Sequence, residues 1–495
     1  MKLHVLISFL ALALWGGGLP VSAAELPNIV YILADDIGYG DLSCYGATKI
    51  QTPNCDRLAK EGLRFTDAHS TAAVCTPTRY SFMTGEYHWR KSGTGILRGI
   101  DGLIIEPGRT TVPELLRRAG YTTGVVGKWH LGLGTTPTDY NVEITPGPLD
   151  VGFDYAWLLP ATGDRTPCVW VENRRVVNLD PADPIKLDYS VQRGEPRSFV
   201  QGIPRIGSQE GGTAALWTDT EIADVIAAQG IAFIEKSVET GKPFFLYLST
   251  HDIHVPRVPH DRFRGMSQAG VRGDSLVSFD WTVGQIVDTL EKLKLTENTL
   301  IIVTSDNGGI LDTNGPDSVN SGTVATNNGH LHNGVLRGEK GTPFEGGTRV
   351  PFIVKWPGRV PVGESDALIC QIDMLATLAA LTGQPLADND APDSENILDC
   401  LLDGKKPGRE LLVENGQSLR MGLWKLVPAA GGARPNPQAA PSPAGDRNNF
   451  SGKPWLFHLG NDLSEQNDVS ADNPEILAKM QGELQRIRRT PRTRP

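Results

Sequence analysis

The segment CTPTR at residues 75–79 combines a thiol, a proline and an arginine within one helical turn. Proline is favoured in a first helical turn, because its missing N–H would have no partner there anyway. The apolar residues that follow can continue the helix, and Gly85 can end it. The helix dipole would favour an anion at Cys75, and Arg79 would add a fixed positive charge. The segment predicts a reactive cysteine at the N-terminus of a helix, although a buried structural cysteine is the alternative.

Oxygen-bearing side chains directly follow two apolar segments, at residues 28–34 (NIVYILA) and 299–304 (TLIIVT). They are Asp35, Asp36, Asp306 and Asn307. Carboxylate and amide oxygens suit a hard cation such as Ca²⁺ or Mg²⁺. Each pair alone would be interpreted as a solvated turn. A shared position at one edge of a sheet favours a cation site instead.

Basic side chains and histidines follow two further apolar segments and lie in a glycine-rich loop. They are Lys128 and His130 after residues 123–127, His251 and His254 after residues 243–249, and Lys340 in the loop 337–347. Histidine titrates near neutral pH, as proton transfer to and from a leaving oxygen requires. We prefer His254 to His251 as the residue that transfers this proton, but spacing alone does not exclude His251. Any one of these residues on its own would usually be structural or on the surface.

The four apolar segments alternate with stretches of helical periodicity at residues 218–238 and 274–295. This alternation predicts an α/β fold with a mostly parallel central sheet flanked by helices on both faces. A further strand is expected at residues 350–354. The carboxyl ends of parallel strands meet at one edge of the sheet, where ligands bind. That edge would gather the side chains named above into one site.

We expect a catalytic domain at residues 24–389 and a smaller C-terminal α+β subdomain at residues 390–495. Within the subdomain we expect strands at 419–427 and 455–459, a flexible Pro/Ala/Gly-rich loop at 427–449 and a helix at 474–488.

The N-terminal residues predict export. Lys2 precedes an apolar run from Leu3 to Trp15, and small residues lead to Ala23, as in a secretory signal peptide over residues 1–23. No later stretch reaches the roughly 18 apolar residues of a membrane span. The formal net charge of −10 argues against a nucleic-acid partner. We expect a soluble periplasmic or secreted protein, in which the six cysteines invite disulfides.

Taken together, the motifs resemble those of the type I sulfatases, which belong to the alkaline phosphatase superfamily. The matching blocks are the aspartate pair at 35–36, CTPTR at 75–79, GKWHLG at 127–132, HVP at 254–256, SDNG at 305–308 and GEKGTPFEGG at 338–347. They occur in the family's order and spacing. The family usually has serine before the arginine, and Thr78 keeps the hydroxyl. The resemblance implies that a formylglycine-generating maturation enzyme oxidises Cys75 to Cα-formylglycine.

The resemblance also implies a Ca²⁺ site, with Mg²⁺ less expected, and a set of catalytic residues. The implied cation ligands are Asp35, Asp36, Asp306, Asn307 and the converted Cys75. The implied catalytic residues are Cys75, Arg79, Lys128, His130, His254 and Lys340. In the implied reaction a hydroxyl of the hydrated aldehyde, activated by a carboxylate such as Asp306, attacks sulfur, and His254 protonates the alcohol that leaves. His130 then takes a proton from the second hydroxyl, and sulfate is released.

Loops must build the alcohol half of the site, and the longest are residues 132–212 and 310–337. Candidates for sugar contact are Trp157, Arg165, Trp170, Arg174 and Arg175 in the first loop and His330, His332 and Asn333 in the second. Aromatic and basic side chains suit a sugar face and its neighbouring anions, although the tryptophans could equally pack the loops. We expect a carbohydrate sulfatase with incidental activity on aryl sulfates. The alternatives are a phosphate or phosphonate ester hydrolase of the same fold and an inactive homologue that binds sulfated glycans.

Overall fold

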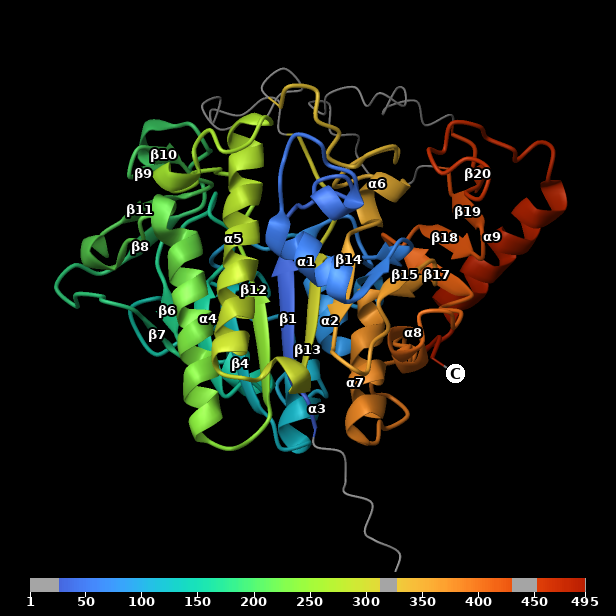
Figure 1. Ribbon diagram of the computed structural model, residues 1–495. Helices are drawn as coiled ribbons and strands as arrows, with labels where there is room; N and C mark the ends of the chain where they lie inside the picture. The colour runs from blue at the N-terminus through green and yellow to red at the C-terminus, as the bar shows by residue number, and fades with distance from the viewer. Residues whose placement is uncertain (1–25, 312–326, 430–451, 495) are drawn as a thin grey trace, which may run out of the picture.

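A large mixed sheet forms the centre of the molecule (Figure 1). The computed structural model describes residues 26–311, 327–429 and 452–494. Within these ranges ten strands lie in the order β15-β2-β14-β13-β1-β12-β4-β5-β6-β7. Their bounds, in that order, are Gly363–Ser365, Leu63–Phe65, Phe352–Lys355, Thr299–Ser305, Asn28–Ala34, Phe244–Ser249, Thr122–Lys128, Tyr155–Leu159, Val171–Glu172 and Arg175–Val176.

The middle of the sheet is parallel. β1 pairs in parallel with β12 and β13, β12 with β4, and β4 with β5. Four of these strands are the apolar segments singled out in the sequence, which are buried on both faces as strands of a parallel sheet are. The predicted α/β fold class is therefore confirmed.

The strand expected near residue 350 is β14, and it runs antiparallel to β13. The chain between the two strands includes α6 (Glu345–Thr348), which lies just before β14. Because β14 starts from the edge where β13 ends, it must run back across the sheet. Two further antiparallel pairs, β5 with β6 and β6 with β7, lie at the other end of the strand order.

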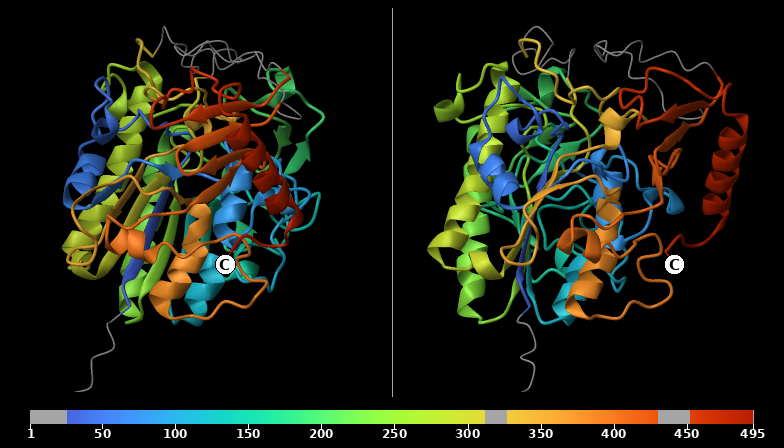
Figure 2. Two further views of the ribbon diagram at one scale, coloured as in Figure 1. Left: turned by 90° about the vertical axis from the view of Figure 1, so that its right-hand side faces the viewer. Right: turned by 45° about the vertical axis from the view of Figure 1, so that its right-hand side comes forward.

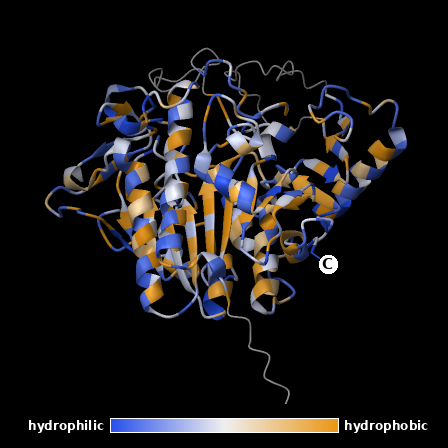
Figure 3. Ribbon diagram, viewed as in Figure 1, coloured by the Kyte–Doolittle hydropathy of each residue, from blue (hydrophilic) through white to orange (hydrophobic). Residues whose placement is uncertain are grey.

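Helices cover both faces of the sheet (Figure 2). The helices on one face are α1 (Pro53–Glu61), α4 (Ile222–Glu239) and α5 (Gly270–Lys292), and those on the other are α2 (Cys75–Thr84), α3 (Val112–Arg118) and α7 (Met374–Thr382). Alternate residues of β1 enter the two cores, Val30 and Ile32 on the first face and Tyr31 and Leu33 on the second. Figure 3 shows the resulting hydrophobic centre.

A four-stranded antiparallel sheet with one long helix forms the smaller C-terminal subdomain. Its elements are β17 (Leu411–Glu414), β18 (Ser418–Met421), β19 (Trp424–Val427), β20 (Trp455–His458) and α9 (Pro474–Arg489). The single strand expected at 419–427 was wrong, because Gly422 adopts a positive φ of 57° and turns the chain into the β18–β19 hairpin. The final helix is confirmed.

Short elements complete the described chain. They are β3 (Ala68–His69), β8 (Lys186–Asp188), β9 (Phe199–Val200), β10 (Ile203–Pro204), β11 (Ser208–Glu210), β16 (Ile369–Cys370) and α8 (Leu398–Leu402). The expected signal peptide at residues 1–23 and most of the loop at 427–449 lie outside the described residues. Among the helices that are described, none is long and apolar enough to cross a membrane. All six cysteines are described and are free thiols.

The central strand β12 offers a test of this arrangement. Leu248 is fully buried between the sheet and its helices. We expect Leu248→Ala to lower the free energy of unfolding by about 2–5 kcal/mol, through lost burial and a residual cavity. The matched control is Leu423→Ala in the β18–β19 turn, where the side chain is 53% exposed, and its effect should stay within about 0.5 kcal/mol. Urea unfolding measures both, and equal losses would contradict the placement of β12.

Candidate active site

The carboxyl ends of β1, β4, β12 and β13 meet at one edge of the sheet. The backbone N–H of Asp306 donates to the carbonyl of Ala34 at 3.1 Å, and that of Asp35 donates to Asp252 at 3.1 Å. These bonds continue the sheet past its last strand residues and hold the polar residues of adjacent strands side by side. The residues that the sequence assigned to catalysis and cation binding lie in this region, and hydrogen bonds and ion pairs connect them.

Cys75 is the first residue of α2 and is buried. Its Sγ lies 3.2 Å from Nδ1 of His130. The other ring nitrogen of His130, Nε2, lies 3.0 Å from the carbonyl oxygen of Leu97. Because a carbonyl can only accept, Nε2 carries the proton and Nδ1 is left as an acceptor that faces Cys75. Burial and the positive charge of Lys128 hold the pKa of His130 well below its usual value, so this imidazole is neutral.

Arg79 is buried and ties α2 to three strands. Its Nε and Nη2 donate to Oδ2 of Asp306 at 3.0 and 2.8 Å. Its Nη1 donates to the carbonyl of Lys128 at 3.1 Å and to the hydroxyl of Ser249 at 2.5 Å. Ser249 ends β12 and had not been recognised in the sequence, where it carries no motif. The guanidinium therefore fixes the N-terminal part of α2 against the edge of the sheet.

Three carboxylates and two ammonium groups lie in direct contact beside Arg79. Nζ of Lys128 is 2.6 Å from Oδ2 of Asp35 and 3.8 Å from Oδ2 of Asp306. Nζ of Lys340 is 2.6 Å from Oδ1 of Asp36. The amide of Asn307 donates to the same Asp36 oxygen at 2.8 Å. Lys340, which stands in the glycine-rich loop far along the sequence, is thus part of the strand-end cluster.

Two oxygens of this cluster, Oδ1 of Asp35 and Oδ1 of Asn307, are buried without a hydrogen-bond partner among the described residues. An unpaired buried acceptor is costly, and a bound cation would satisfy both. Burial raises the pKa of Asp35 to about 8 despite the nearby Lys128, so the protein alone does not keep this carboxylate ionised at neutral pH. Both unpaired donors are oxygens, which Ca²⁺ and Mg²⁺ prefer, and the imidazole of His254 lies beside them. The residues present fit a divalent hard cation.

Comparison with known proteins decides the family, because a model described as Sulfatase matches residues 27–384. The chain belongs to the sulfatase family. It is 44% identical over 489 residues to an N-acetylgalactosamine-6-O-sulfatase of Bacteroides thetaiotaomicron, and the match covers 94% of each chain. It is 33% identical to human arylsulfatase A, over 94% of this chain and 88% of the relative. The chain is therefore a sulfatase, a sulfuric ester hydrolase.

A solved structure supports the same assignment. It was described with the metabolism of multiple glycosaminoglycans by Bacteroides thetaiotaomicron and matches with a TM-score of 0.87 and 44% identity, covering 94% of this chain and 99% of that one. The fold and the small C-terminal subdomain of this sulfatase are thus shared with a known relative.

His254 of the sulfatase lies beside the carboxylates. Its Nδ1 is 2.7 Å from the carbonyl of Val255, and its Nε2 is 3.9 Å from Oδ2 of Asp36. Burial and the nearby Lys340 hold the pKa of His254 well below its usual value. Although burial opposes it, Asp36 raises the pKa of Lys340 above its usual value, so the ammonium stays charged. The cluster thus places a charged donor and a neutral imidazole side by side.

His251 has a different task from His254. Its Nε2 accepts the backbone N–H of Gly163 at 2.9 Å. Arg205 donates to the carbonyl of the same glycine. A Cβ at Gly163 would lie 2.3 Å from the imidazole, so this close approach requires glycine. His251 therefore anchors the loop that carries Asp164 and Arg165.

Asp164 and Arg165 bring this loop next to the reacting centre. Nη1 of Arg165 is 2.6 Å from Oδ1 of Asp164. Burial opposes the charged form of both side chains. Even so, Asp164 and Cys75 raise the pKa of Arg165 above its usual value. Arg165 and His254 in turn lower the pKa of Asp164 below its usual value. Asp164 had not been recognised in the sequence, because nothing in a long irregular loop marks it. Its charge interacts with that of the predicted substrate arginine, Arg165, and with His254.

Most other sugar-contact candidates of the sulfatase pack the protein instead. Trp170 packs between Trp157 and Trp217 with tilted rings, whose centroids are 6.2 and 5.9 Å away. Arg174 donates to both oxygens of Asp150, at 2.8 and 2.9 Å.

The second loop shows the same pattern. His330 is 2.8 Å from Oδ1 of Asp41, and Asn333 bonds the backbone of Gly309 and Gly338 at 3.0 to 3.2 Å. Residues 312–326 of that loop lie outside the described part of the chain.

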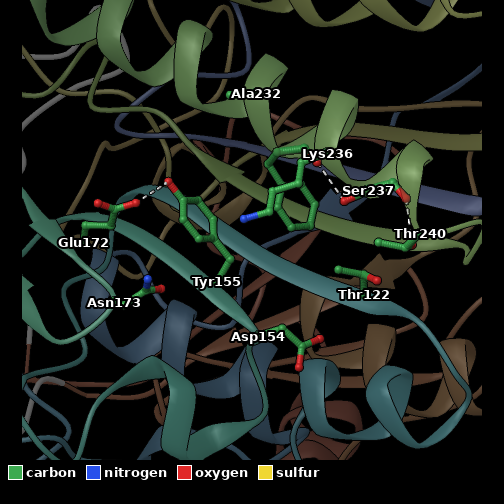
Figure 4. A pocket seen from close by; sticks show the side chains of 10 residues that line it. Thr122, Asp154, Tyr155, Glu172, Asn173, Ala232, Lys236, Ser237 and Thr240 are labelled. Carbon is green, nitrogen blue, oxygen red and sulfur yellow. Dashed lines mark hydrogen bonds between the residues drawn. The ribbon is translucent and has the colours of Figure 1, made fainter.

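A separate cavity of about 380 Å³ opens at the opposite edge of the sheet, where β4 and β5 begin (Figure 4). Its lining includes Tyr155, whose hydroxyl is 3.3 Å from Glu172, together with Asn173 and Lys236. None of the predicted site residues lines it. The cavity is distinct from the strand-end site.

The buried His251 makes a testable contribution to acid sensitivity. Burial and then Lys128 lower its pKa to about 3, whereas in the unfolded chain it titrates near 6.5. Between these values unfolding takes up one proton, so stability is complete above pH 6.5 and falls as the pH drops toward 3. We expect His251→Gln to reduce the pH slope of the unfolding free energy by about 1.4 kcal/mol per pH unit between pH 4 and 6. Urea titrations at several pH values measure the slope, and an unchanged slope would contradict the neutral buried state.

Proposed function

We propose that this sulfatase is an exported enzyme that hydrolyses sulfate monoesters of carbohydrates with a formylglycine at position 75 and a bound Ca²⁺. One observation carries the proposal. The thiol of Cys75 opens a buried helix 3.2 Å from an unprotonated nitrogen of His130, on the same sheet edge as a cluster of three aspartates, an asparagine and three basic side chains. This is the arrangement needed to hold a small anion beside a nucleophile.

The cation would be bound by the side chains that hold unused oxygens. We assign Asp35, Asp36, Asp306 and Asn307 as ligands, with the oxidised Cys75 side chain as a further one. Ca²⁺ is preferred to Mg²⁺, because a flexible set of five or more oxygens at one strand edge suits the larger ion. Bound there, it would polarise a sulfate oxygen and offset negative charge.

The charges at the site support an anionic substrate. When all three aspartates are ionised, they balance Arg79, Lys128 and Lys340, and the site before metal binding is close to neutral. A divalent cation leaves two positive charges in excess, and a sulfate monoester carries one negative charge. The remaining positive charge is available for the charge that develops on the leaving oxygen.

Formylglycine at position 75 would supply, in its hydrated form, one hydroxyl to attack sulfur and a second to drive sulfate release. In the structure Sγ of Cys75 occupies the place of these hydroxyl oxygens. We assign Nδ1 of His130 as the acceptor of the proton from the second hydroxyl, because it faces this position. Asp306 is the assigned base for the first hydroxyl. Its Oδ2 already accepts two bonds from Arg79, whereas Oδ1 accepts one long bond, from the N–H of Asp36 at 3.3 Å, and is assigned this role.

The leaving alcohol needs a proton on the other side of the sulfate. His254 and Lys340 both contact Asp36 and are the assigned donors. A bound sulfate ester would favour the charged form of His254, whose Nε2 is turned toward the carboxylate cluster. Lys340, already charged, would stabilise the leaving oxygen by hydrogen bonding.

A sugar is the proposed alcohol. Support comes from the relative at 44% identity, which is named for 6-O-desulfation of N-acetylgalactosamine, so a 6-sulfated amino sugar is the first candidate. The loop pinned by His251 supplies Asp164 and Arg165 next to the site, an acceptor for hydroxyl groups and a donor for a neighbouring anion. Export and maturation by a formylglycine-generating enzyme complete the proposal. Export rests on the sequence pattern of residues 1–23.

A substrate panel tests the function. We expect turnover of 6-O-sulfated N-acetylgalactosamine, alone or at the end of an oligosaccharide, and slower turnover of an aryl sulfate. An aryl phosphate and an aryl phosphonate, the esters of the alternative enzyme class, should be poorer by several orders of magnitude. Turnover confined to these two esters would overturn the proposal. Binding of sulfated oligosaccharides without any turnover would favour the inactive homologue.

Formylglycine can be detected directly at position 75. In active protein we expect peptide mass spectrometry to show an aldehyde oxygen in place of the Cys75 thiol. Cys75→Ala should lower kcat by more than about a thousandfold, the scale for loss of a covalent nucleophile, with little change in melting temperature. Cys44→Ala, at a half-buried thiol outside the site, is the control and should keep activity. An active preparation with only intact Cys75 would refute the assignment.

The cation site can be tested through Asp306. Asp306→Ala removes a proposed ligand and the bidentate partner of Arg79, so metal content and activity should both fall by more than about tenfold, the scale for ligand-sphere mutations. Asp150→Ala also removes a carboxylate bonded twice to an arginine, but far from the site, and should preserve both. Elemental analysis measures the metal, and a chelator should lower the melting temperature of wild-type protein alone. An Asp306→Ala protein with normal metal content would refute the ligand set.

A further inference from the structure

The turn between β17 and β18 reaches from the C-terminal subdomain into the active-site region. At its start, Asn415 uses both ends of its side-chain amide. Oδ1 accepts the backbone N–H of Ala73, and Nδ2 donates to the carbonyl of Thr342 at 3.0 Å. The backbone N–H of Asn415 adds a bond to the carbonyl of Thr71 at 2.9 Å. One residue of the subdomain thus contacts two separate loops of the main sheet domain.

Both loops carry residues of the proposed site. Ala73 lies two residues before Cys75, and Thr342 lies two residues after Lys340. The loops also touch directly, since the N–H of Gly341 donates to the carbonyl of Ala73 at 2.8 Å. The side chain of Asn415 therefore spans the junction between the nucleophile and the cation proposed to stabilise the leaving group.

The β17–β18 turn is held by a buried ionic cluster that does not include Asn415. Glu414, the preceding residue, accepts from Thr348 at 2.5 Å and lies 2.8 Å from Nδ1 of His69. Lys425 of β19 lies 2.8 Å from Glu345 and 3.2 Å from Glu414. These five side chains are all fully buried. The turn consequently has a fixed position, from which Asn415 can hold the two loops.

We propose that Asn415 is a positioning residue for sulfate-ester hydrolysis, which holds the loops of Cys75 and Lys340 in register. The proposal rests on the proposed function of these two residues. An amide is required because one end must accept an N–H while the other donates to a carbonyl. Without it, Ala73 and Thr342 would each have an unpaired backbone group, and the loops would shift to find other partners. A displacement of about 1 Å at a reacting group can cost roughly a hundredfold in rate.

Two substitutions distinguish the effect of the Asn415 side chain from the effect of the backbone of the turn. Asn415 has a positive φ of 54° and precedes Gly416 at 65°, so Asn415→Gly keeps the backbone conformation and removes only the amide. Asn415→Asp keeps the acceptor for Ala73 but replaces the donor to Thr342 by a carboxylate oxygen. The matched control is Asn173→Gly. Asn173 has a φ of 53° and accepts the N–H of Ala156 at 3.1 Å, beside the remote cavity of Figure 4.

Two measurements test the proposal on full-length protein. The first is kcat and KM for an aryl sulfate, corrected for the formylglycine content at position 75. We expect Asn415→Gly to lower kcat by about tenfold to a hundredfold, with KM within about threefold, and Asn173→Gly to stay within about twofold on both. The second is hydrogen exchange of peptides covering residues 71–75 and 338–347. Exchange should be faster in both peptides for Asn415→Gly, and only in the second for Asn415→Asp.

The proposal would be overturned if kcat of Asn415→Gly matched that of Asn173→Gly, or if exchange in both loops were unchanged. If Asn415→Gly did not fold, the loop-specific exchange of Asn415→Asp would decide instead, and exchange equal to wild type would count against the proposal. Wild-type protein without sulfate-ester turnover would refute the proposed function. The exchange experiment would still decide whether Asn415 holds the two loops.

Discussion

Three aspartates lie close together in a buried place, and the rest of the site follows from the need to keep them ionised there. Burial in a low dielectric and repulsion between like charges at short range both oppose the ionised state of such a cluster. The raised pKa of Asp35 is the sign of this conflict. Lys128 and Lys340 relieve it in part by direct contact. The two unpaired oxygens fit a cation, which in the proposed function would complete the balance.

The same constraint explains why the reactive residue is anchored from several sides. Arg79 neutralises Asp306. It also bonds the carbonyl of Lys128 and the hydroxyl of Ser249, and so fixes the N-terminal part of α2 against the strand ends. The loop before α2 is fixed independently by backbone bonds to the Lys340 loop and by the turn of the C-terminal subdomain. The proposed nucleophile at position 75, held by both its helix and the preceding loop, would therefore have little freedom to move away from the anion that it attacks.

Much of the fold and the strand-end residues could be predicted from the sequence, because both depend on local patterns. Buried parallel strands have continuous apolar runs, and their ends share one edge of the sheet, so Asp35 and Asp306 could be placed together. Contacts made across long separations leave no such signal. The roles of Ser249, Asp164 and Asn415 depend only on their neighbours in space. The direction of β14 depends on the path of the loop that precedes it. Trp170 and His330 carry chemistry suited to a sugar, but burial against Trp217 and Asp41 uses them for packing.

A crystal structure of the mature, active enzyme, with anomalous scattering used to identify the metal, would show whether a cation holds the three aspartates together. We predict one divalent ion at the strand ends, about 2.3–2.6 Å from oxygens that include Oδ1 of Asp35 and Oδ1 of Asn307, with an oxidised side chain at position 75 facing it. An active enzyme with no ion at this edge of the sheet, or with those two oxygens still unbound, would contradict it.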